Sequence, residues 1–100
     1  MSFFGLFGGG DTDQIQEYLK KGAIVVDVRT QMEFDQGHAP DSVLITLDTI
    51  PQSVEKIKAY GKPIILVCRS GGRAGSAKGF LERYGIDAIN GGPWQAVLQE

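Results

Sequence analysis

Residues 64–73 read IILVCRSGGR, and this stretch combines a strand, a sharp turn and the beginning of a helix. The apolar run from Ile64 to Val67 shows no alternation with polar residues, which is typical of a strand covered on both faces of a parallel sheet. The two glycines that follow allow the backbone to turn sharply toward a helix. The stretch therefore predicts an α/β domain in which Cys68 stands at the carboxyl end of a buried central strand.

Strands and helices alternate along the rest of the chain. Three further strands are predicted, at 23–28 (AIVVDV), 42–47 (SVLITL) and 87–90 (DAIN). Capping residues and helical spacing of apolar residues predict helices at 12–21, 31–35, 51–60, 74–84 and from 94 onward. Short connections between alternating strands and helices favour right-handed crossovers, so we expect a mainly parallel central sheet with helices on both faces.

The size and composition of the chain indicate one soluble globular domain. A chain of 100 residues has room for one hydrophobic core. Its 42% hydrophobic and 22% charged residues are ordinary globular proportions, which exclude a disordered or collagen-like chain. We expect residues 11–100 to form the domain and the apolar residues 1–10 (MSFFGLFGGG) to form a flexible leader, too short to cross a bilayer and unlike a signal peptide.

Charge and residue counts narrow the classes of partner. A net charge of −2 gives no reason to expect nucleic acid, because that binding depends on many Lys and Arg contacts to phosphates. A single cysteine excludes an intramolecular disulfide, so the reducing cytoplasm is the simplest location. With His38 as the only histidine, no His-rich or Cys-His metal site is predicted, and no cofactor. We expect His38 to be structural and Trp94 to pack at the edge of the core.

The loop at 68–73 (CRSGGR) combines features that activate a thiol. Its Gly-Gly turn lets successive N–H groups point inward and form an anion-binding cradle. The positive end of the following helix and two arginines favour the thiolate over the thiol. A lone cysteine is ordinarily a small buried apolar residue, but a structural cysteine has no need of such a loop. We therefore predict a nucleophile, Cys68, whose substrate is bound by Arg69, Ser70, Gly71, Gly72 and Arg73.

Two polar residues at the end of the first strand are predicted to support this loop. Asp27 and Arg29 follow a buried run, and the carboxyl ends of neighbouring parallel strands lie at one edge of the sheet. Either they hold the active loop by an ion pair or hydrogen bonds, or Arg29 contacts the substrate directly. Glu33 is predicted to pair with Arg29 or to cap its own helix, because its spacing from Thr30 matches a capping box.

The segment CRSGGRAGSA (68–77) resembles the active loop of the rhodanese family, sulfurtransferases with the form Cys-x-x-Gly-x-Arg followed by a small-residue helix. The resemblance extends over roughly residues 12–98, through VVDVRTQMEFDQGHAPDSVLITL (25–47) and GIDAINGGPW (85–94). It implies a rhodanese-like three-layer fold. It also implies that Cys68 takes sulfane sulfur from a small anionic donor such as thiosulfate, holds it as a persulfide, and passes it to a thiol, cyanide or protein acceptor.

Two alternatives stand beside the sulfurtransferase hypothesis. Cysteine-dependent phosphatases, including relatives on the same fold, place five residues between Cys and Arg, whereas four separate Cys68 from Arg73 here. The shorter loop fits a sulfur atom better than a tetrahedral phosphate. The second alternative is a non-catalytic binding or regulatory module whose basic loop docks an acidic partner.

Overall fold

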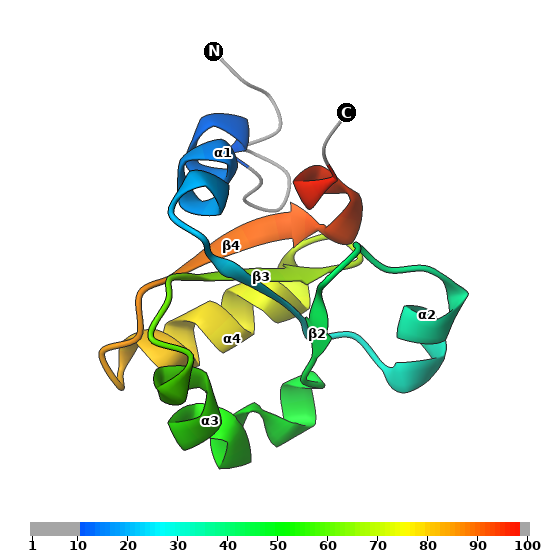
Figure 1. The fold of residues 1–100 in the computed structure, drawn as a ribbon. Helices are drawn as coiled ribbons and strands as arrows, with labels where there is room; N and C mark the ends of the chain where they lie inside the picture. Colours follow the sequence, from blue (N-terminus) through cyan, green and yellow to red (C-terminus); the bar gives the residue numbers. More distant parts are fainter. Residues whose placement is uncertain (1–10, 99–100) are drawn as a thin grey trace.

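In a computed structural model that describes residues 11–98, a four-stranded parallel sheet lies between two layers of helices (Figure 1). The strands are β1 (Ile24–Asp27), β2 (Val43–Leu44), β3 (Ile64–Cys68) and β4 (Ala88–Pro93), in the order β2-β1-β3-β4. The predicted α/β class and parallel central sheet are confirmed. The leader predicted at 1–10 lies outside the described residues.

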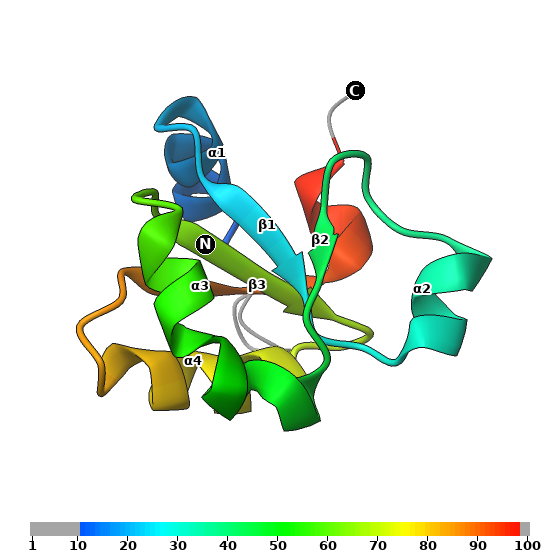
Figure 2. The same ribbon diagram turned by 60° about the horizontal axis from the view of Figure 1, so that its bottom comes forward.

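Helices cover both faces of the sheet, as expected. One face carries α1 (Thr12–Lys20) and the 3-10 helix η3 (Trp94–Val97), and the other carries the 3-10 helix η2 (Leu47–Ser53) with α3 (Val54–Ala59) and α4 (Gly72–Glu82) (Figure 2). The short helix α2 (Gln31–Gln36) lies beyond the carboxyl ends of the strands. Between residues 11 and 98, no helix is both long and apolar enough to span a bilayer.

Strand β3 is buried along its whole length and separates the two cores. Ile64 and Leu66 pack with the side chains of α3 and α4, whereas Ile65 and Val67 pack with those of α1 and η3. Burial of each such side chain contributes about 1.5–3 kcal/mol. This is why the strand shows no polar alternation. Cys68 ends the strand on the α4 side, with 1% of its surface exposed.

The second predicted strand and the helix after it differ from the expectation. Only Val43–Leu44 pairs as a regular strand, instead of 42–47, because Thr46 begins the turn into η2. The helix predicted at 51–60 begins as the 3-10 helix η2, which contains Pro51, and becomes α-helical only at Val54. Proline lacks the N–H that a helix interior needs, which limits regular α-helix to the residues after it.

The bounds of α4, β4 and the last helix differ slightly from those predicted. Helix α4 begins at Gly72, two residues before the predicted start, so the second glycine of the loop is already helical. Strand β4 continues to Pro93 rather than ending at residue 90. The helix predicted from residue 94 is the single 3-10 turn Trp94–Val97.

Candidate active site

Cys68 stands at the carboxyl end of β3, directly before the loop that leads into α4. The backbone N–H of Gly71 donates a hydrogen bond to the Cys68 Sγ atom at 3.0 Å. Gly71 is the N-cap of α4 and has φ of 107°, a conformation that side-chain-bearing residues rarely adopt. The loop therefore turns back on itself so that one backbone donor of the predicted cradle faces the sulfur.

The side chain of Asn90, in β4, binds the backbone carbonyl group of Gly71. Its Nδ2 group donates to the Gly71 carbonyl oxygen at 2.9 Å, and its Oδ1 atom accepts from the Gly92 N–H at 2.9 Å. The Gly71 carbonyl also accepts from the N–H of Gly75 at 2.8 Å. Gly71 is thus fixed at its N–H by the sulfur and at its carbonyl by two donors. Sequence reasoning missed Asn90, although a polar residue inside a predicted strand was a signal.

A bulge at Gly91 sets the position of the residues that follow Asn90. Leu66 pairs with Asn90 and Val67 with Gly92, so Gly91 has no partner in β3. A Cβ atom at Gly91 would lie 2.8 Å from the Cγ2 atom of Ile65, closer than side chains approach one another. Bulges redirect side chains and are common beside active sites.

Because of this bulge, the residue opposite Cys68 is Pro93 rather than Gly92. Trp94 is the next residue along the chain. It packs against the α1-side core, as predicted, and it also lies 5.2 Å from the guanidinium carbon of Arg29, measured to the ring centroid.

Asp27 and Arg29 form a buried ion pair beside the end of β3. The Arg29 Nη2 atom lies 2.7 Å from the Asp27 Oδ2 atom, and Arg29 Nε donates to the same carboxylate. Nη2 also donates to the carbonyl oxygen of Gly37 at 2.7 Å. Asp27 is fully buried and Arg29 is 5% exposed. The pair joins β1 to the segment after α2 and to Trp94, and its support of the active loop stays a prediction.

Glu33 pairs with Arg73, so the predicted pairing with Arg29 is wrong. The two carboxylate oxygens accept from Arg73 at 2.8 and 3.0 Å. The predicted capping box with Thr30 is confirmed, because Glu33 Oε1 accepts from the Thr30 N–H and Thr30 Oγ1 accepts from the Glu33 N–H. The Arg73 hydrogen bonds, and then the Thr30 N–H, hold the pKa of Glu33 well below its ordinary value. Glu33 in turn raises the pKa of Arg73.

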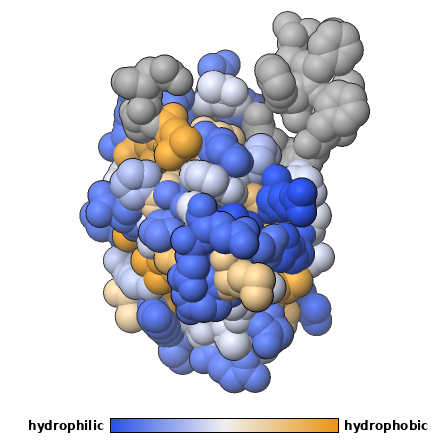
Figure 3. Space-filling view, turned by 90° about the vertical axis from the view of Figure 1, so that its right-hand side faces the viewer, coloured by the Kyte–Doolittle hydropathy of each residue, from blue (hydrophilic) through white to orange (hydrophobic). Residues whose placement is uncertain are grey.

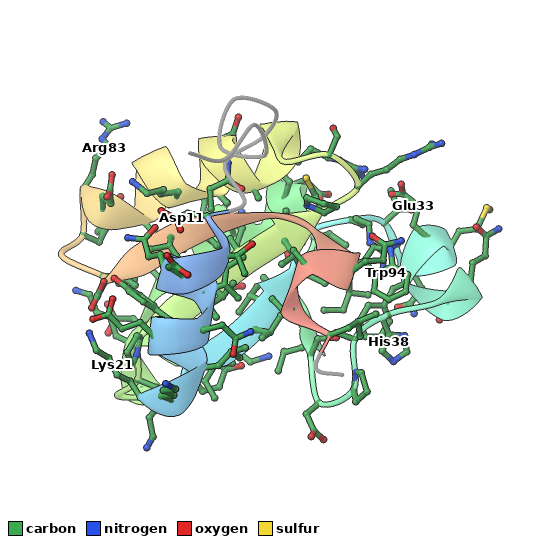
Figure 4. All side chains as sticks on the ribbon, turned by 90° about the horizontal axis from the view of Figure 1, so that it is seen from above. Asp11, Lys21, Glu33, His38, Arg83 and Trp94 are labelled. Atoms are coloured by element: carbon green, nitrogen blue, oxygen red, sulfur yellow. The ribbon has the colours of Figure 1, made fainter. Side chains whose placement is uncertain are left out.

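A cleft of about 330 Å³ opens at this end of the sheet. It is lined by Arg29, Glu33, Gln36, Gly37, Arg69, Trp94 and Gln95. Figure 4 shows Glu33 and Trp94 at the same end of the molecule, with Lys21 and Arg83 at the other end. The face that carries α2 is mainly hydrophilic, with small apolar patches (Figure 3). Two arginines, Arg29 and Arg69, line this polar cleft, and Arg69 directly follows the buried Cys68.

The family model for the rhodanese-like domain matches residues 11–92. The chain belongs to the rhodanese-like domain family. It is 32% identical over 93 residues to the thiosulfate sulfurtransferase GlpE of Pseudomonas savastanoi pv. phaseolicola, which covers 88% of this chain and 87% of that relative. It is 29% identical over 81 residues to a sulfurtransferase of Allochromatium vinosum, covering 79% of this chain and 75% of the relative.

Solved structures of rhodanese-like domains have the same fold. A rhodanese-like domain protein from Staphylococcus aureus matches with a TM-score of 0.73 at 35% identity, over 89% of each chain. The rhodanese-like fold and the family that CRSGGRAGSA indicated are therefore confirmed.

His38, which was predicted to be structural, packs against α2. His38 stacks on the ring of Phe34 with centroids 3.7 Å apart, and its Nδ1 atom lies 2.7 Å from the Phe34 carbonyl oxygen. The His38 ring is thus held against α2. Among the residues described, no three His, Cys, Asp or Glu side chains group closely enough to hold a metal ion.

Sequence reasoning also missed Gln36 and Gln95, whose place in the cleft depends on how α2 and η3 meet.

Proposed function

We propose that this rhodanese-like domain is a sulfurtransferase in which Cys68 carries sulfane sulfur as a persulfide. The observation that carries the proposal is the hydrogen bond of 3.0 Å from the Gly71 N–H to the Cys68 Sγ atom. It lies within a loop that has four residues between Cys68 and Arg73. A backbone donor aimed at the sulfur stabilises negative charge there without supplying a proton.

The reaction would proceed in two displacements at sulfur. In the first, the Cys68 thiolate attacks the outer sulfur of a donor such as thiosulfate, the sulfur–sulfur bond of the donor breaks, and its electron pair leaves with sulfite. In the second, cyanide or a thiolate attacks the outer sulfur of the persulfide. The electron pair of that sulfur–sulfur bond returns to Sγ, which regenerates the thiolate.

The charges around the loop support an anionic donor. Arg69 and Ser70 are exposed directly after Cys68, and Arg69 forms no ion pair with any residue of 11–98. Helix α4 has eleven residues and begins at Gly72, so the positive end of its dipole lies at the loop. Arg73 is already paired with the carboxylate of Glu33. In this proposal Arg73 therefore fixes the loop and adds positive potential, while Arg69 binds the donor.

The fixed geometry of Gly71 supports the same assignment. Its carbonyl accepts from both Asn90 and Gly75, so its N–H need not reorganise when charge develops at the sulfur. The proposal also includes a reducing location such as the cytoplasm, because Cys68, the single cysteine, can attack the donor only while its thiol has not been oxidised.

Intact-mass measurement tests the proposal directly. The full chain is incubated with thiosulfate, and one added sulfur atom is expected, which cyanide then removes as thiocyanate. Cys68→Ser should show no adduct, whereas Arg83→Gln, which removes an exposed cation at the far end of the molecule, should load normally. An adduct that persists in Cys68→Ser, or turnover of a phosphate ester in place of thiosulfate, would overturn the proposal.

A further inference from the structure

The cleft described above lies over the end of the strand that carries Cys68. Arg69 is the next residue after Cys68 and forms one wall. Trp94 follows Pro93, the residue paired with Cys68 across β3 and β4. Arg29 lies two residues after Asp27, which is paired with Val67 on the other side of β3. Part of the wall therefore comes from residues that follow three adjacent strands, and the rest comes from α2 and the residue after it. The cleft lies at the edge of the sheet where ligands of α/β proteins bind.

The polar groups of this cleft differ in how much of their bonding capacity is already used. Arg29 is buried against Asp27 and Gly37, and Glu33 is held by Arg73. Arg69, in contrast, is exposed and forms no ion pair within the described part of the chain. Its guanidinium is thus the cation of the cleft that is available to a ligand, and guanidinium groups bind carboxylates with paired hydrogen bonds.

The other groups of the lining match a peptide-like molecule. Gln36 and Gln95 are exposed, and each amide both donates and accepts hydrogen bonds. The half-buried ring of Trp94 offers an apolar surface in the same cleft. Trp94 and Gln95 lie beyond residues 11–92, the stretch that the family model matches, so family membership alone assigns them no role.

We propose that this cleft binds the sulfur acceptor and that the acceptor is a small thiol with a carboxylate and an amide group. The assignment rests on the proposed persulfide of Cys68. The carboxylate would pair with Arg69, and the amide would bond to Gln36 or Gln95. The volume of about 330 Å³ is at the lower end of the range for small-molecule sites, which is roughly 300–1,000 Å³. Cyanide would use none of these groups.

The transfer step itself is a displacement without net oxidation. The thiol of the acceptor loses its proton to solvent, and its thiolate attacks the outer sulfur of the Cys68 persulfide. The sulfur–sulfur bond to Sγ breaks, its electron pair returns to Sγ, and the acceptor leaves as a new persulfide. The cleft contributes by holding the thiolate near the end of β3, which lowers the entropic cost of the encounter.

A matched pair of acceptors tests the assignment. The protein is first loaded with thiosulfate, freed of excess donor and checked by intact mass for the persulfide. N-acetylcysteine, which has a carboxylate, and its uncharged amide are then mixed with it, and the rate of discharge is compared per concentration of thiolate. We expect N-acetylcysteine to react roughly fivefold faster, the gain of one exposed ion pair.

Two variants and one control separate this site from a general charge effect. Arg69→Gln should bring the ratio of the two rates close to one, and Gln95→Glu should lower the rate with N-acetylcysteine more than the rate with the amide. Arg83→Gln removes the same charge far from the cleft and should keep the fivefold ratio. Equal rates in the unaltered protein, or a ratio that survives Arg69→Gln, would overturn the assignment. A failure of the unaltered protein to load Cys68 would be visible in the mass before any acceptor is added, and would overturn the proposed function as well. Arg69→Gln is expected to load more slowly, because Arg69 also meets the donor, and it is incubated with thiosulfate until its mass shows the persulfide.

Discussion

Asn90 lies 19 residues from Gly71 in sequence, yet its side-chain amide donates to the Gly71 carbonyl oxygen at 2.9 Å. This contact joins β4 to the loop that follows Cys68. Asn90→Ala removes it and leaves the Gly92 N–H without its acceptor. We expect the free energy of unfolding to fall by about 1–3 kcal/mol, the cost of an unpaired polar group, in urea denaturation. The rate of persulfide formation should fall by roughly tenfold, because the Gly71 N–H is no longer held against the sulfur.

Asn90→Asp distinguishes positioning from stability. The carboxylate keeps an acceptor for the Gly92 N–H, but it directs a negative oxygen at the Gly71 carbonyl in place of the amide donor. The loop should therefore be disturbed more than the strand. A variant that is destabilised yet forms the persulfide at the normal rate would show that Asn90 has no positioning role.

Gly91→Ala tests the bulge in β4. A Cβ atom at Gly91 would approach the Ile65 Cγ2 atom to 2.8 Å and the Leu66 carbonyl oxygen to 3.2 Å, so the two strands must separate. We expect a loss of about 1–3 kcal/mol in the free energy of unfolding, as for other overpacked cores. Gly79→Ala is the matched control, because Gly79 lies in α4 and a Cβ atom there meets nothing within 4 Å. That change should stabilise the protein by about 0.5–1 kcal/mol.

Features of the site that adjacent residues determine could be predicted from the sequence. Features that depend on contacts between residues far apart in the sequence could not. The position of Cys68 and the turn after it follow from adjacent residues, so IILVCRSGGR was sufficient to predict them. The Asn90 contact and the bulge at Gly91 depend on the register of β4 against β3, which no local pattern reports. Glu33 and Arg73 are 40 residues apart, and only the fold determines that α2 meets α4 there.

Glu33→Gln should make the stability of the protein less sensitive to acid. Hydrogen bonds from Arg73 lower the pKa of Glu33 from its ordinary value of 4.5, so the folded state keeps this carboxylate ionised where the unfolded chain takes up a proton. The ion pair therefore contributes fully above pH 4.5 and is lost as the pH falls below it. Urea midpoints of the two proteins should differ at neutral pH and converge in acid, whereas a constant difference would contradict the assignment.

The hydrogen bond of Tyr18 should make the stability of the protein fall as the pH rises in the alkaline range. Its hydroxyl donates to Asp87, and this hydrogen bond, with burial, raises the pKa of Tyr18 from 10.0 to about 12. A raised pKa means that the folded state binds the proton more tightly, so the contribution is present below pH 10 and disappears as the pH rises toward 12. Tyr18→Phe should lose this part of the alkaline dependence. Absorbance titration should show one tyrosine that ionises late in the unaltered protein and is missing in the variant.

Gly71→Ala tests the loop conformation on which the sulfur contact depends. The φ of 107° is unfavourable for alanine, so the substitution costs about 1–3 kcal/mol or moves the loop out of this conformation. We expect persulfide formation on Cys68 to fall by roughly tenfold or more, because the Gly71 N–H leaves the Sγ atom. Gly85→Ala is the matched control, since Gly85 also has a positive φ, 76°, but follows the far end of α4 with open space around it. It should lose comparable stability and load sulfur normally. If both variants lost loading in proportion to stability, the contact between Gly71 and Cys68 would have no role beyond folding.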